Sequence, residues 1–151
     1  MKHFAKPVLA ALCMFIITSS IAQKPSSQKP FLFNNFPSVI NCTEAQLSNL
    51  FNADKGQQVN LSLPGNLTLQ GPVTKKINKY NSLQTIAVQL PGFKNILFSV
   101  TKRMGADNRP IYIGHLFSSN YADGYELKRS SNNTYQFIKI ETEKLLPTCN
   151  Q

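Results

Sequence analysis

From Gln57 onward, apolar and polar residues alternate with a period of two, and this alternation restricts the chain to a β-rich fold. The alternating apolar residues form short runs, namely Val59, Leu61 and Leu63; Leu67 and Leu69; Ile86, Val88 and Leu90; Ile96, Phe98 and Val100; and Ile138 and Ile140. Short strands with short connections usually pair antiparallel with their neighbours along the chain. We therefore predict a mainly β protein in which an antiparallel meander of about seven strands forms a sandwich or a partly open barrel.

Turn-forming residues separate these runs. Pro64-Gly65 and Pro91-Gly92 are typical of type II turns, Asp123-Gly124 is typical of a hairpin turn, and the polar stretch 130–133 predicts a further reversal. Between them, residues 109–117 carry apolar groups on both faces of a strand. This pattern predicts a central strand, with Gly114 leaving room for a close neighbour.

One short helix is predicted at the start of the folded part. Thr43 and Gln46 fit a capping box, in which the two side chains satisfy the free amides of the first helical turn. Leu47, Leu50 and Phe51 follow at helical spacing, and Gly56 offers a stop. We expect about two helical turns with one apolar face.

The first 22 residues have the three regions of a secretory signal peptide. Lys2 and Lys6 precede an apolar run over residues 8–18, and small residues lead to Ala22. The run is too short to span a bilayer, and we predict no transmembrane anchor elsewhere. We expect cleavage near Ala22 and a secreted or periplasmic protein, with a flexible leader over 23–36 and a single β-rich domain over 37–151.

The leader ends in a cluster of apolar residues. Phe31, Phe33 and Phe36 follow a polar, proline-containing stretch. We expect the cluster to pack onto the domain as an edge strand or a staple. The alternative is a protein-interaction segment in which these three rings dock onto a partner.

The cysteines indicate one disulfide bond. Cys13 would leave with the signal peptide, so the exported chain would keep Cys42 and Cys149. An even pair in an oxidising compartment most simply forms a structural disulfide, here joining the two ends of the domain. Neither cysteine belongs to a Cys-x-x-Cys motif or has a neighbouring histidine, which argues against a redox or catalytic role.

Few residues suggest catalysis. His115 alternates in phase with Ile111 and Ile113, which predicts a structural histidine on the core face of its strand. We predict no metal site and no cofactor, because the exported chain would keep only one histidine and two paired cysteines, which cannot form a zinc ligand set. The enzyme alternative is a small glycan hydrolase that uses acids such as Asp123 and Glu126, since such a pair leaves no linear motif.

The chain is basic, and its cations group near predicted turns. Removal of Lys2 and Lys6 would lower the formal charge from +9 to +7. We predict a non-enzymatic binding domain whose ligand is an anionic polysaccharide or a component of the cell envelope. Tyrosines such as Tyr80 and Tyr112 could add stacking, whereas the competing interpretation is a set of solvated loops. The candidate binding residues are Lys75, Lys76, Lys79, Tyr80, Lys102, Arg103 and Arg109.

Overall fold

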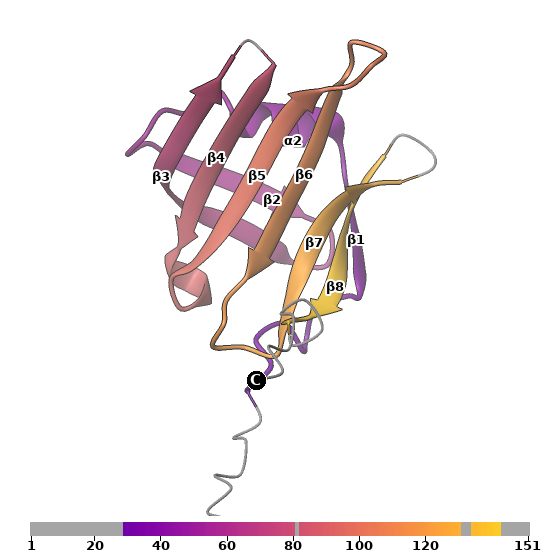
Figure 1. Cartoon of the computed structure of the whole chain (residues 1–151). Helices are drawn as coiled ribbons and strands as arrows, with labels where there is room; N and C mark the ends of the chain where they lie inside the picture. Colours follow the sequence, from indigo (N-terminus) through magenta and orange to yellow (C-terminus); the bar gives the residue numbers. More distant parts are fainter. Residues whose placement is uncertain (1–28, 81, 131–133, 143–151) are drawn as a thin grey trace, which may run out of the picture.

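The computed structural model describes residues 29–80, 82–130 and 134–142, and its strands form one eight-stranded antiparallel sheet (Figure 1). The order across the sheet is β1-β8-β7-β6-β5-β4-β3-β2, a meander in which the first strand lies beside the last. The elements are β1 (Val39–Cys42), α2 (Glu44–Leu50), β2 (Gln58–Leu63), β3 (Leu67–Lys79), β4 (Leu83–Leu90), the 3-10 helix η2 (Pro91–Phe93), β5 (Ile96–Met104), β6 (Pro110–Phe117), β7 (Asp123–Arg129) and β8 (Tyr135–Glu141). The predicted antiparallel meander is confirmed, and it curls into a half-barrel.

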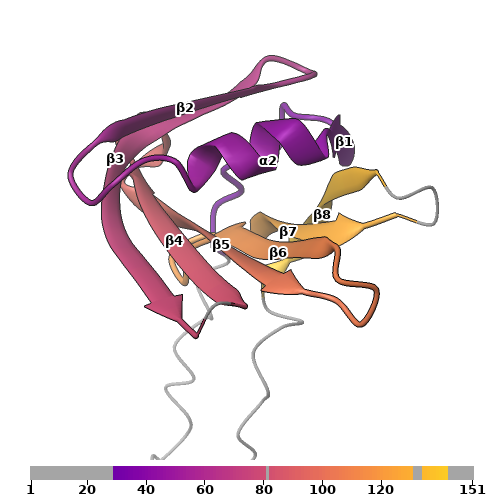
Figure 2. The same cartoon turned by 90° about the horizontal axis from the view of Figure 1, so that it is seen from above.

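Helix α2 lies within the curl, with β2 on one side and β5 and β6 on the other (Figure 2). The predicted capping box is present, because the Thr43 hydroxyl accepts the Gln46 amide at 3.2 Å and the Gln46 side chain accepts the Thr43 amide at 2.9 Å. Leu47 and Leu50 are buried on the inner face of the helix. The helix ends at Leu50, so Gly56 belongs to the following loop.

The curl depends on a sharp bend in β3. At Gly71 an added Cβ would lie 1.8 Å from the backbone oxygen of Gln89, so the two strands approach closely enough to require glycine. Pro72 follows, and the register with β4 then shifts between Val73 and Lys75. Such irregularities increase the local bend of a strand. They allow β2 and the first half of β3 to fold over α2.

The inward residues of the strands form one continuous core. It includes Leu61 and Leu69 from the β2–β3 hairpin, Val88 from β4, Phe98 from β5 and Phe137 from β8. The predicted alternation is therefore correct for these runs. In β8, however, Tyr135 and Phe137 face the core, and Ile138 and Ile140 are half-buried.

The prediction for His115 is wrong. In β6 it is Tyr112 and Leu116 that point inward, whereas Ile113, His115 and Phe117 are exposed on the outer face. Gly114 does make the close approach expected of it, because an added Cβ would lie 2.6 Å from the Ser99 carbonyl oxygen. The strand is thus covered on one face only.

Two predicted turns are also corrected. Asp123 and Gly124 lie inside β7, where Gly124 packs against Phe117, so they form no hairpin turn. Residues 91–93 form the 3-10 helix η2 instead of a type II turn. Gly65 does adopt a positive φ of 75° at the β2–β3 turn, as a type II turn requires.

The apolar cluster of the leader packs onto the domain, as the staple interpretation predicted. Phe33 is fully buried and its ring lies 5.2 Å from that of Tyr125, centroid to centroid. Phe36 is half-buried against the same core. Because Phe33 is buried, it cannot contact a partner. Of the three rings in the predicted protein-interaction segment, only that of Phe31 is well exposed, with an exposed fraction of 53%.

Cys42 lies on β1 and its thiol is buried. The structure shows no disulfide bond among the described residues, and Cys149 lies outside them, so the Cys42–Cys149 pair stays a prediction. The predicted signal peptide also lies outside the described residues. Burial raises the pKa of the Cys42 thiol to about 12. Cys42 therefore remains a neutral thiol at physiological pH if it is not oxidised, which leaves it unreactive.

Candidate functional site

Three of the six predicted basic residues, Lys79, Arg103 and Arg109, lie toward one end of the sheet. Figure 1 shows the β3–β4 and β5–β6 connections at the same end of the sheet, with the β4–β5 connection, which contains η2, at the opposite end. Lys79 ends β3, Arg103 lies one residue before the end of β5, and Arg109 precedes β6. We call Lys79, Tyr80, Arg103 and Arg109 the basic end.

Lys79 and Arg103 lie on the same outer face of the sheet. Lys79 is paired with Leu83 of β4, and Leu83 is paired with Arg103 of β5. Directly paired residues of antiparallel strands point to the same face. Two strand spacings place these backbones about 10 Å apart, and both side chains are exposed. Two cations at this spacing can contact successive anionic groups of one polymer.

Tyr80 protrudes beside this pair. It is 89% exposed and adopts a positive φ of 54°, an uncommon backbone conformation for an aromatic residue. An exposed aromatic ring next to a cation can stack on a planar base or on the apolar face of a sugar. The predicted combination of tyrosine and basic residues is therefore present at this connection.

Arg109 lies in the β5–β6 connection, which is closed by its own backbone. The Gly105 amide donates to the Arg109 carbonyl at 2.8 Å, and the Arg109 amide donates to the Asp107 carboxylate at 3.1 Å. The Arg109 side chain is exposed. Asp107 places one negative charge in the same connection.

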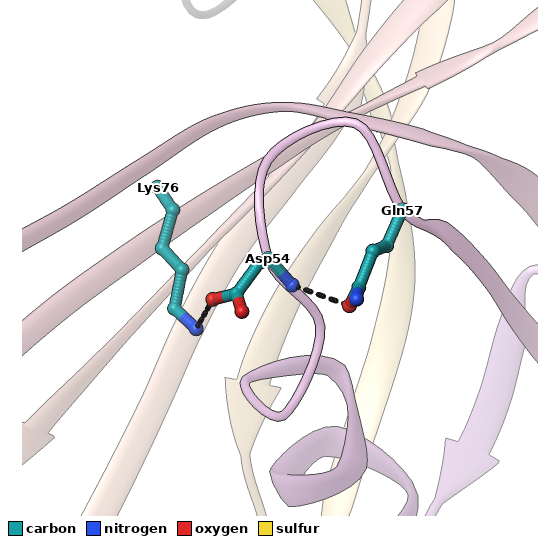
Figure 3. Close-up of polar contacts among 3 residues, drawn as sticks. All are labelled: Asp54, Gln57 and Lys76. Atoms are coloured by element: carbon teal, nitrogen blue, oxygen red, sulfur yellow. Dashed lines mark hydrogen bonds and ion pairs between the residues drawn. The ribbon is translucent and has the colours of Figure 1, made fainter.

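Three predicted binding residues do not join the basic end. Lys76 donates to the carboxylate of Asp54 at 2.9 Å, and Asp54 is itself held by a hydrogen bond from its amide to Gln57 at 2.8 Å (Figure 3). This ion pair neutralises Lys76. Lys102 is paired with the inward-facing Tyr112, so its side chain lies on the concave face of the sheet. Lys75 lies on the outer face but four residues before Lys79 along β3, away from the basic end.

The prediction that Tyr112 could stack on a ligand is wrong. Its ring is 1% exposed, and it packs against Phe51 and Tyr135. Burial raises the pKa of Tyr112, and a hydrogen bond with Ser48 opposes that shift. Of the described tyrosines, Tyr80 is the one that is strongly exposed.

The acids named for the hydrolase alternative do not share a cleft. Asp123 is 2% exposed on the inner face of β7, where its carboxylate accepts the amides of Leu32 and Phe33. Glu126 is on the outer face of β7, paired in register with His115 and 2.7 Å from the ammonium group of Lys128. These two acids are thus separated by the sheet itself. Among the described residues, no group of His, Cys, Asp and Glu side chains could hold a metal ion.

A groove at the other end of the molecule was not predicted. It has a volume of about 360 Å³ and lies between the outer face of the β2–β3 hairpin and η2. Gln58, Thr68 and Gln70 line one side, and Gly92 and Phe93 line the other. The signal that could have found it is the run 56–74, which contains no charged residue in an otherwise basic chain.

Comparison of the chain with protein-family models, with curated proteins and with solved structures found no match. In the part of the chain that the structure describes, no helix is long and apolar enough to cross a membrane.

Proposed function

We propose that this protein is an exported, non-enzymatic binding domain that takes an anionic polymer, such as an acidic polysaccharide or an envelope component, at the basic end. The observation that carries the proposal is the pairing of Lys79 and Arg103 across β4, with the exposed ring of Tyr80 beside them. The ligand class follows from charge and spacing. Anionic polymers repeat their charge along a chain, and two cations on a rigid sheet can match that repeat.

The geometry also limits which cations contribute. Lys76 is compensated by Asp54, and Lys128 is compensated by Glu126. Lys79, Arg103 and Arg109 make no ion pair within the described residues, and Asp107 is the acid nearest in sequence to Arg103 and Arg109. Lys55, Lys75, Lys94 and Lys102 make no ion pair within the described residues either, so what distinguishes the basic end is the grouping of three exposed cations with the exposed ring of Tyr80. Exposed cations release bound counterions when they contact a polyanion, which favours association at low salt.

Charge-reversal variants test this location. Lys79→Glu and Arg103→Glu are compared with Lys94→Glu, which makes the same change in net charge beside η2 at the opposite end. The measurement is the salt concentration at which each purified protein elutes from immobilised polygalacturonate and from immobilised dextran sulfate. We expect both basic-end variants to elute at clearly lower salt than wild type, and Lys94→Glu to elute close to wild type.

The matched control separates a site from a general charge effect. If the three variants shift by the same amount, net charge alone drives retention and the proposed location is wrong. If none of them shifts on either column, the proposal of an anionic ligand is wrong. Circular dichroism of each variant is the control for folding, and we expect the fold to be retained because the substituted positions are exposed.

A further inference from the structure

We infer that the groove between the β2–β3 hairpin and η2 is a binding site for an uncharged sugar unit of a glycan. The groove has the size of a small-molecule site, for which volumes of about 300–1,000 Å³ are typical. It lies at the opposite end of the sheet from the basic end. It is therefore a second site, independent of the proposed anion-binding function.

The hydrogen-bonding groups of the groove come from the outer face of the hairpin. The register pairs Asn60 with Gln70 and Ser62 with Thr68, while the intervening leucines point into the core. Within the described residues, the side chains of Gln58, Thr68 and Gln70 have no protein hydrogen-bond partner. An amide group offers both donors and an acceptor, so it can bind two neighbouring hydroxyl groups of one sugar.

The opposite wall is apolar and fixed in place. Phe93 lines the groove and also packs against Phe33, with ring centroids 5.4 Å apart, and against Phe36 at 6.0 Å. Pro72 and Pro91 add rigid apolar surface. A sugar ring has polar edges and a less polar C–H face, so amides on one wall and apolar surface on the other suit it.

The charge pattern disfavours an ionic ligand at this place, because Lys94 at the end of η2 is not among the lining residues. All the residues that line the groove are uncharged, and the sequence has no charged residue between Lys55 and Lys75. An anionic or cationic ligand would lose hydration here without gaining an opposite charge. Binding at the groove should therefore be nearly independent of salt, in contrast to binding at the basic end.

Glycine provides the means to block the groove. Gly92 lines it, and an added Cβ at this position would meet no atom within 4 Å. Its φ is not among the positive values, so a larger residue fits the backbone. Gly92→Leu should fill the groove without disturbing the core. Gln70→Ala removes one amide from the opposite wall, and Gln84→Ala is the matched control because it removes an amide from β4 near the basic end.

The experiment is a titration of uniformly ¹⁵N-labelled protein with neutral hexasaccharides of β-1,4-linked glucose, β-1,4-linked N-acetylglucosamine and α-1,6-linked glucose, up to about 10 mM. We expect at least one sugar to shift the amide signals of Gln58, Thr68 and Gln70, equally at low and high salt. Gly92→Leu should abolish these shifts, Gln70→Ala should weaken the affinity at least severalfold, and Gln84→Ala should leave it unchanged.

Three results would overturn this inference. They are the absence of shifts with all three sugars, shifts that survive Gly92→Leu, and shifts that map to the basic end instead. The variants Lys79→Glu and Arg103→Glu distinguish the two proposals, because they should lower the salt concentration at which the protein elutes from the polyanion columns while leaving sugar binding at the groove intact. As a control for folding, the spectra of the two groove variants should resemble that of wild type before sugar is added.

Discussion

Asp123 and Lys139 hold Phe33 by its two backbone groups. The Asp123 carboxylate accepts the Phe33 amide at 2.9 Å, and the Lys139 ammonium group donates to the Phe33 carbonyl at 2.7 Å. The two residues come from β7 and β8 at the inner side of the sheet, with Lys139 also 5.9 Å above the Tyr125 ring. Two oppositely charged side chains on adjacent strands thus tie the backbone of the N-terminal segment to the sheet.

Asp123→Asn should lower the free energy of unfolding by about 1–3 kcal/mol, because the two amides of Leu32 and Phe33 lose a charged acceptor in a buried place. Chemical denaturation monitored by circular dichroism measures this change. Asp107→Asn is the control, since Asp107 accepts one amide at the exposed β5–β6 connection. Equal stability of Asp123→Asn and wild type would show that the carboxylate does not hold the segment.

Phe33→Ala should lower the free energy of unfolding by about 3–5 kcal/mol, because it opens a cavity in a buried aromatic cluster. The other rings of this cluster are those of Phe36, Phe93 and Tyr125. Phe31→Ala is the matched substitution two residues away, at a ring that is 53% exposed. It should change stability by less than about 0.5 kcal/mol. Thermal and chemical unfolding of the two variants compare them directly, and similar losses for both would contradict the staple.

Stability should fall as the pH rises above about 9. Burial, with a smaller effect of the Asp123 carboxylate, raises the pKa of Tyr125 to about 12 from an ordinary value of 10.0, and burial raises that of the Cys42 thiol from 9.0 to about 12. A raised pKa in the folded state means that the unfolded state loses its proton first. The stabilising contribution is therefore complete below pH 9 for the thiol and below pH 10 for the phenol, and it is lost toward pH 12.

The pH at which this decline begins tests the disulfide prediction. Each group contributes about 1.4 kcal/mol per pH unit within its window. If Cys42 is bonded to Cys149, the thiol does not titrate, and the decline should begin only near pH 10 in wild type. Reduction with dithiothreitol should then move the onset to about pH 9. An unchanged onset after reduction, with two titratable thiols before it, would contradict the predicted bond.

The fold followed from the sequence more closely than the site did. Alternation in β2 to β5 and the capping box of α2 depend on neighbouring residues, and both were predicted correctly. In β6 both faces carry apolar residues, so periodicity alone could not decide which face is covered, and His115 was placed on the wrong one. When the two faces of a strand are similarly apolar, the hydrophobic pattern predicts the strand but not which of its faces is buried.

The candidate site depends on pairing between distant residues. The position of Lys79 relative to Arg103 follows from the register of two successive hairpins, which the sequence does not specify. The ion pair of Lys76 with Asp54 depends on the curl of β3 over α2. The groove likewise arises where η2 meets the bent hairpin. Such contacts come from tertiary structure, and local sequence patterns do not contain them.

The salt dependence of polygalacturonate affinity tests the central claim most directly. We predict that the plot of log affinity against log salt is steep for wild type, and that its slope is shallower by roughly one and a half for the double variant Lys79→Glu with Arg103→Glu, as expected when two ionic contacts are lost. Lys94→Glu should leave the slope as in wild type. Equal slopes for wild type and the double variant would show that Lys79 and Arg103 do not contact the polyanion, and would contradict the proposed function of the basic end.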